Sequence, residues 1–277
     1  MEISEIIKDS YGLNLIPGSL RGILDKDQAS KVYFAETDKG KVIIKTSVWH
    51  ETLGAYEKAY EISEGLRAKG VKLAKAFLNK ENKFLTPFDK NNIVVLEYMG
   101  GNAFSAGDGE LFSAGFALAE FHRAGKEYLK EKESEEENIK KAIPVEKPYE
   151  DSGKLYEQIK KDLFAHERCN FPNVCDFLRR NIKELDGAIS FIDSSGVNLS
   201  SRPSGILHND FNVDNILFEE GEVSAILDVD QIGVGPFIWD IANSLISFTW
   251  DRKAKSFYAD TKDKTKHFLE GYHSANG

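Results

Sequence analysis

ILHNDFNVDNILF, the stretch from Ile206 to Phe218, places a polar loop between two apolar segments. A turn at Gly221 and a second apolar run then lead to Asp228. This pattern predicts a hairpin of two strands, with the polar loop directly before the first strand. The returning strand brings Asp228 beside Asp210 and Asn215, so that three oxygen-bearing side chains converge.

These three side chains suit a particular chemistry. Carboxylate and amide oxygens are the hard ligands that Mg²⁺ prefers, and a few protein ligands leave coordination positions open for phosphate and water. Asp210, Asn215 and Asp228 therefore form a candidate magnesium site. Asp210 is placed to accept a proton from a hydroxyl group.

The first hundred residues are predicted to form strands around one helix. Lys31–Ala35 and Lys41–Lys45 are short β-rich runs separated by a turn that contains Asp and Gly. The segment Thr52–Lys69 repeats apolar or small residues at helical spacing. Asn91–Tyr98 is a buried strand in this interpretation, and it ends close to the Gly100-Gly101 pair.

The rest of the chain is predicted to be mostly helical, with apolar stripes at positions such as Leu111, Leu118 and Ile182. The Gly100-Gly101 pair gives the connection backbone freedom and marks a lobe boundary. We therefore expect an α+β fold with two lobes. Residues 1–99 form a small antiparallel sheet with one main helix, and residues 100–277 form a larger, mostly helical lobe.

Composition and charge exclude several classes of protein. The 277 residues carry 36 Lys plus Arg against 45 Asp plus Glu, a net charge of −9. This acidic balance is a poor match to nucleic-acid phosphates, so we expect no nucleic-acid partner. The acidic start of the chain and the lack of a long apolar run predict a cytoplasmic protein without membrane association. Cys169 and Cys175 are expected to be reduced and structural. No feature of the sequence indicates an oligomeric state.

The HND motif, Asn215 and the downstream Asp228 together resemble the catalytic and metal-binding loops of the aminoglycoside phosphotransferase family. This family includes type II homoserine kinases and choline-kinase-like enzymes. The resemblance implies a bilobal protein-kinase-like fold, with ATP in the 1–99 lobe, the acceptor site in the 100–277 lobe, and ATP and Mg²⁺ as cofactors. It also implies that Asp210 is the catalytic base, that Asn215 and Asp228 hold Mg²⁺, and that His208 is structural.

Other features that resemble the family occur in the same order along the chain. Lys45 ends its strand at the position where the family places the lysine that contacts the phosphates of ATP. Glu57 on the following helix is the expected partner of Lys45. Glu61, one turn later, faces roughly the same side and stays an alternative. Leu96–Gly100 resembles the hinge, whose backbone groups at Glu97 and Met99 would hold the adenine edge.

One departure concerns the phosphate loop. The segment Gly22–Tyr33 has no G-x-G-x-x-G pattern of the protein-kinase kind. This absence argues against a protein kinase and suits small-molecule kinases. Gln28 and Ser30 are the nearest candidates to donate hydrogen bonds to the β-phosphate.

The resemblance predicts a phosphotransferase that moves the γ-phosphoryl group of ATP to a hydroxyl of a small molecule, such as an aminoglycoside, homoserine, choline or a sugar-like compound. A non-catalytic nucleotide-binding protein of the same fold is the alternative. A metal-dependent phosphohydrolase built on His208 and Asp210 would need more histidine ligands than the sequence offers. Asp230 is either a second metal-side acid or a hydrogen-bonding residue, and Asp240 is expected to be architectural.

Overall fold

The computed structural model of the protein describes residues 2–24, 30–47, 53–89, 91–143, 157–158, 160–161, 179–180, 182–194 and 202–275. Two compact units make up the chain: Met1–Pro144 with Pro203–Gly277, and Val145–Arg202. The predicted boundary between residues 99 and 100 lies inside the first unit, so the division into two lobes stays a prediction. Gln28, Cys169 and Cys175 lie outside the described residues.

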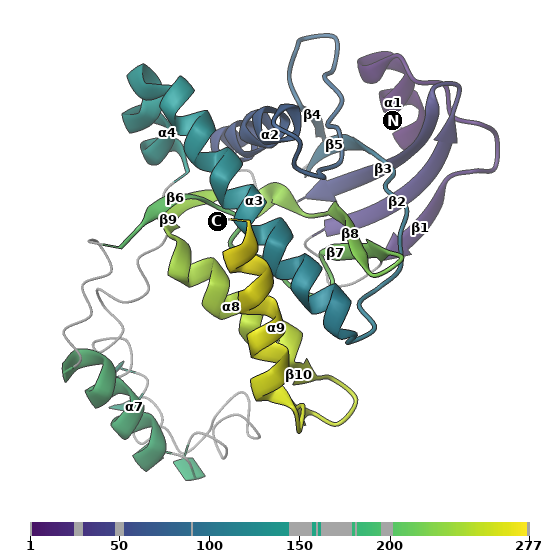
Figure 1. The fold of residues 1–277 in the computed structure, drawn as a ribbon. Coiled ribbons are helices and arrows are strands. Elements are labelled where there is room, and N and C mark those ends of the chain that lie inside the picture. The colour runs from purple at the N-terminus through teal and green to yellow at the C-terminus, as the bar shows by residue number, and fades with distance from the viewer. Residues whose placement is uncertain are drawn as a thin grey trace. The chain divides into compact units, whose positions relative to one another are not determined.

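A five-stranded antiparallel sheet forms the first part of the chain (Figure 1). Its strands lie in the order β1-β2-β3-β5-β4. The predicted strands and the predicted helix are present as β2, β3, β5 and α2, whereas α1 was not predicted. The elements are α1 (Ile3–Tyr11), β1 (Arg21–Leu24), β2 (Ser30–Thr37), β3 (Gly40–Ser47), α2 (Leu53–Ala68), β4 (Leu85–Phe88) and β5 (Asn91–Glu97).

Helices and three small two-stranded sheets, β6–β9, β7–β8 and β10–β11, form the remainder. The elements are α3 (Asp108–Glu131), η1 (Glu133–Glu135), α4 (Glu136–Ala142), β6 (Ser204–Leu207), β7 (Ile216–Glu219), β8 (Glu222–Ile226), η3 (Val229–Gln231), β9 (Gly233–Pro236), α8 (Phe237–Thr249), β10 (Trp250–Asp251), β11 (Ser256–Phe257) and α9 (Thr261–Ser274). Within the second unit the structure describes α7 (Ile182–Ser194). No helix in these ranges has the length and apolar character that a bilayer span requires.

The predicted hairpin after the polar loop is the β7–β8 pair, in which Glu219 lies opposite Glu222. The two turn residues between them, Glu220 and Gly221, have φ values of 52° and 84°. Positive φ at both central positions defines the type I′ turn, whose twist matches that of the paired strands. The turn therefore returns β8 antiparallel to β7 and delivers the chain to Asp228.

Alternation along β3 determines which face of the sheet carries Lys45. Val42 and Ile44 pack with α1 in one apolar core. Lys45 follows Ile44 directly, and successive side chains of a strand point to opposite faces. Its partner in the register is Val94, which packs in the other apolar core together with α2. Lys45 thus lies on the face opposite α1.

Two glycines allow α3 and α9 to pack closely, and Figure 1 shows the two helices side by side. A Cβ atom added at Gly115 would overlap the backbone carbonyl of Phe268, and one added at Gly271 would overlap that of Phe112. Because the obstructing atoms belong to backbone, neither helix can give way by changing a rotamer.

We expect Gly115→Ala to lower the free energy of unfolding by about 1–3 kcal/mol or more, because α3 and α9 would be forced apart. Gly109→Ala is the matched control on the same helix, since a Cβ there meets no atom within 4 Å. It should change stability by less than about 1 kcal/mol. Urea unfolding measures both variants, and equal stability of the two would contradict close packing at Gly115.

Candidate active site

The polar loop between β6 and β7 holds Asp210 by hydrogen bonds to both carboxylate oxygens. Asn212 Nδ2 donates to Oδ1 at a distance of 2.6 Å, and Asn215 Nδ2 donates to Oδ2 at 2.8 Å. Asn215 Nδ2 also reaches the backbone carbonyl of Asp210 at 2.9 Å. Burial raises the pKa of the half-buried Asp210 carboxyl, although these hydrogen bonds oppose the shift. The loop therefore presents an oriented carboxylate of increased basicity.

Asp240, near the start of α8, fixes the beginning of the same loop. Its buried carboxylate accepts the backbone N–H of His208 at 2.7 Å and that of Asn209 at 2.8 Å. Asn209 has a φ of 64°, a left-handed conformation that is costly for a residue with a side chain. The bonds to Asp240 offset that cost, so its expected architectural role has a physical basis.

Two buried histidines complete this network. His122 on α3 has Nε2 3.0 Å from Asp240 Oδ2 and Nδ1 2.8 Å from the Tyr272 hydroxyl on α9. Because the carboxylate only accepts, His122 donates through Nε2 and accepts from Tyr272. His208 is buried and lies 3.0 Å from the Leu227 carbonyl through Nε2, which identifies it as a structural member of the loop.

Lys45 lies at the meeting point of the sheet and the segment after β8. Its Nζ is 2.7 Å from Asp228 Oδ1 and 2.5 Å from Asp230 Oδ2. Burial lowers the pKa of Lys45, but the two carboxylates more than compensate, and the net pKa lies above its usual value. The ammonium is therefore charged and held by two acids from one short segment.

A cavity of about 340 Å³ adjoins Lys45. One part is apolar and has the hinge at its edge, whereas the other carries the ammonium, carboxylate and amide groups. Such a slot with a few convergent polar groups is typical of small-ligand sites. Its apolar lining includes Val32, Ile43, Leu96, Leu217 and Ile226, its hinge lining Glu97, Met99 and Gly101, and its polar lining Lys45, Asn215, Asp228 and Asp230.

The hinge runs beside β7. Asn102 and Phe218 exchange two backbone hydrogen bonds, of 2.7 and 2.9 Å. Gly101 has a φ of 147°, and a Cβ there would overlap the Leu217 and Ser224 side chains. A side chain at this position would force the segment that follows the hinge away from β7 and β8.

The donor set suits a magnesium ion that shares its coordination with phosphate. Asn215 uses Nδ2 for its bonds to Asp210, which leaves Oδ1 as the ligand atom, and Asp228 lines the same cavity. Among the described residues, no group of three His, Cys, Asp or Glu side chains could hold a metal ion. One amide oxygen and one carboxylate would leave most coordination positions of Mg²⁺ to phosphate and water.

The expected pairing of Glu57 with Lys45 is wrong. The Glu57 carboxylate accepts the backbone N–H groups of Phe84 and Leu85, at 3.1 and 2.8 Å, and so fixes the start of β4. Glu61, the alternative, lies 2.5 Å from Lys58 Nζ. α2 turns Tyr60 toward the site instead, and its hydroxyl donates to Asp230 Oδ1 over 2.5 Å.

Sequence reasoning left the role of Asp230 open and did not single out Tyr60. Helical periodicity alone would have placed Tyr60 about 60° around the helix from Glu57, on the neighbouring face. Ser30 begins β2 and pairs with Ser47, but nothing is described of its side chain, and Gln28 lies outside the described residues.

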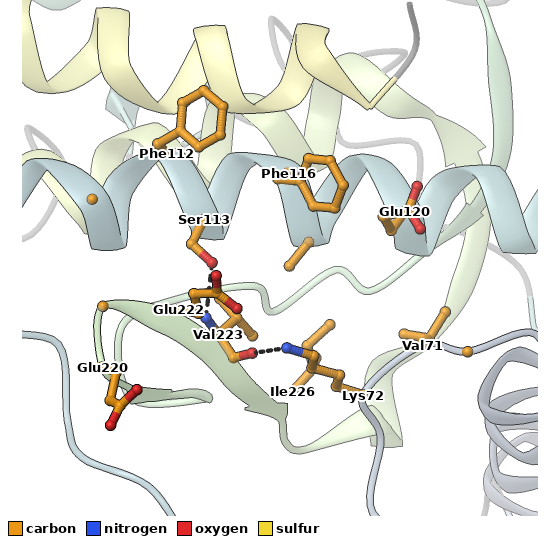
Figure 2. A pocket seen from close by; sticks show the side chains of 14 residues that line it. Val71, Lys72, Phe112, Ser113, Phe116, Glu120, Glu220, Glu222, Val223 and Ile226 are labelled. Atoms are coloured by element: carbon orange, nitrogen blue, oxygen red, sulfur yellow. Dashed lines mark hydrogen bonds between the residues drawn. The ribbon is translucent and has the colours of Figure 1, made fainter.

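Figure 2 shows a second cavity, of about 560 Å³, between α3 and the β7–β8 hairpin. Its walls include the partly exposed Phe112 and Phe116. Lys72, which also lines it, donates a hydrogen bond from Nζ to the Val223 carbonyl. Among the described residues, no predicted site residue lines this cavity. Of the two cavities, the smaller one is the one lined by predicted site residues.

Comparison with solved structures shows the fold. The chain is similar to spectinomycin phosphotransferase APH(9)-Ia in complex with ADP and spectinomycin, with 15% identity and a TM-score of 0.67 over 98% of this chain and 78% of that one. Amicoumacin kinase hAmiN in complex with AMP-PNP, Ca²⁺ and Ami is 20% identical, with a TM-score of 0.65 over 99% of this chain and 77% of that one. Macrolide 2'-phosphotransferase MphH from Brachybacterium faecium is 14% identical, with a TM-score of 0.61 over 99% of this chain and 83% of that one. The expected α+β, protein-kinase-like fold is confirmed.

The model of the phosphotransferase enzyme family, APH, matches residues 22–276. The chain belongs to this family, and the prediction of a small-molecule phosphotransferase is confirmed. No curated protein sequence matches the chain significantly.

The His122 environment predicts a pH-dependent stability. Burial lowers the pKa of His122 below its usual value, against the opposing effect of Asp240. As the pH falls below about 6.5, the unfolded chain binds a proton that the folded chain resists, so the free energy of unfolding decreases. His122→Gln keeps one donor and one acceptor without this proton, and should make the decrease shallower.

Chemical denaturation at pH 7.5 and pH 5.5 measures this effect. His273→Gln, at an exposed position on α9, is the control and should retain the wild-type pH dependence. An unchanged dependence in His122→Gln would contradict a neutral, buried His122.

Proposed function

We propose that the protein is an ATP- and Mg²⁺-dependent phosphotransferase that moves the γ-phosphoryl group to a hydroxyl of a small molecule. One observation carries the proposal: a single cavity joins an apolar slot at the hinge to Lys45, Asn215 and Asp228, and Asn215 is bonded to the Asp210 carboxylate. The residues proposed as base, cation ligands and phosphate lysine are thus adjacent.

The adenine would lie in the apolar slot between Ile43 and Leu217, with its edge at the Glu97 carbonyl and the Met99 amide. The backbone N–H of Tyr98 is already used by the Lys41 carbonyl. Lys45 would then contact the phosphates, with Ser30, the first residue of β2, and Gln28 as further donors. Mg²⁺ held by Asn215 and Asp228 would neutralise charge on the phosphates.

Asp210 would orient the acceptor hydroxyl for in-line attack on the γ-phosphorus. The new bond joins the acceptor oxygen to phosphorus, the bond to the β–γ bridging oxygen breaks, and ADP leaves. The hydroxyl proton passes to Asp210. Its raised pKa favours this step, and Asn212 and Asn215 hold the carboxylate in position.

The candidate acceptors are hydroxyl-bearing small molecules. The solved structures that the chain resembles include enzymes named for spectinomycin, amicoumacin and a macrolide. Hydroxyl-bearing compounds of this kind, together with homoserine, choline and hexosamines, form the acceptor panel to test.

ATP consumption with this acceptor panel tests the function. Asp210→Asn should lower the rate with an accepted substrate by about 10²–10⁴-fold, because the proton loses its acceptor. Glu219→Gln removes the same charge at the exposed far end of β7 and should leave the rate unchanged. Full activity of Asp210→Asn, or a wild-type protein whose melting temperature MgATP does not raise, would contradict the proposal.

A further inference from the structure

The second acid on Lys45 and its tyrosine partner have no role in the function proposed above. Both carboxylate oxygens of Asp230 accept a hydrogen bond. Oδ2 accepts from Lys45 Nζ and Oδ1 accepts from the Tyr60 hydroxyl, each at a distance of 2.5 Å. We propose that Asp230 and Tyr60 are positioning residues that anchor Lys45 to α2, the task expected of Glu57. The purpose of this anchor, holding the lysine toward ATP phosphates, rests on the proposed function.

The two acids that bind Lys45 differ in solvent exposure. The Asp230 side chain is 12% exposed and that of Lys45 13%, whereas the Asp228 side chain is 37% exposed. Tyr60 is 2% exposed. Because solvent screens a buried ion pair less than an exposed one, the bond to Asp230 is the firmer of the two. Asp228 is the acid with an open side toward solvent.

The route to α2 runs through Tyr60 because the glutamates of that helix are engaged elsewhere. Glu57 holds Phe84 and Leu85, and Glu64 accepts the Ala76 backbone N–H at 2.7 Å. Tyr60 lies on the face of α2 that packs on η3, which contains Asp230. The tyrosine side chain is long enough to bring its hydroxyl to the Asp230 carboxylate, and it adds no second negative charge beside that carboxylate.

This arrangement gives the two acids different tasks. A divalent cation at Asp228 would compete with Lys45 for that carboxylate. Asp230, tied to α2 by Tyr60, would keep hold of the ammonium and leave it beside the cavity. With both oxygens occupied, Asp230 is an anchor of the lysine and not a second metal ligand.

Chemical labelling of Lys45 tests the anchor without nucleotide or metal. An amine-reactive acylating reagent is applied, and peptide mass spectrometry gives the rate at Lys45 relative to the exposed Lys39. Loss of a charged hydrogen bond should accelerate labelling about tenfold or more in Asp230→Asn. Tyr60→Phe removes only the hydroxyl and should accelerate it about threefold.

Tyr11→Phe is the matched control. Its buried hydroxyl lies 2.8 and 3.0 Å from the Phe84 and Ile93 carbonyls, which share its one proton, on the α1 side of the sheet. It should lose stability much as Tyr60→Phe does, with Lys45 labelling unchanged. If Asp230→Asn does not fold, Tyr60→Phe still decides the question.

Steady-state kinetics give the second readout. Tyr60→Phe should raise the KM for ATP severalfold more than it changes the KM for the acceptor. Wild-type labelling rates in both variants would overturn the anchor, even in an active enzyme. Loss of Mg²⁺ affinity in Asp230→Asn as large as in Asp228→Asn would overturn it in favour of a metal ligand. A wild-type protein that transfers no phosphate, with labelling as expected, would reject the proposed function and leave the anchor standing.

Discussion

The buried carboxylate of Asp240 is the constraint on which the rest of the site depends. It accepts two consecutive backbone N–H groups of the loop and the imidazole of His122. Through His122 and Tyr272 it joins α8 to α3 and α9, the pair that glycines bring into close contact. A buried carboxylate without these donors would be costly, so the left-handed turn at Asn209 and the packing of α8 against α3 stabilise each other.

A second set of charges joins the sheet to this loop. Lys45 reaches from β3 to Asp228 and Asp230, and Tyr60 adds α2 to the same cluster. The backbone bond from Leu227 N–H to the Asn215 carbonyl, 2.7 Å long, fixes Asp228 against the loop that holds Asp210. The groups proposed to face the nucleotide and the acceptor are thus connected by hydrogen bonds, which would favour a defined distance between phosphate and base.

The sequence predicted what depends on local pattern. Asp210, Asn215 and Asp228 are brought together by one loop and one hairpin, and the alternation that sets the face of Lys45 is a property of a single strand. The partner of Lys45 depended instead on how α2 is rotated against η3, which no local pattern determines. Glu57 therefore appeared suitable by residue type, while Tyr60 carries no charge to attract notice. The helix Ile3–Tyr11 was not predicted, although its apolar residues pack on the sheet.

The central claim is that the cavity beside Lys45 binds a nucleotide through a cation held by Asn215 and Asp228. Isothermal titration with a non-hydrolysable ATP analogue measures this directly. We predict one nucleotide per chain with Mg²⁺ present, and an affinity at least about tenfold weaker when Mg²⁺ is chelated or Asp228 is replaced by Asn. An affinity that depends neither on Mg²⁺ nor on Asp228 would contradict the account.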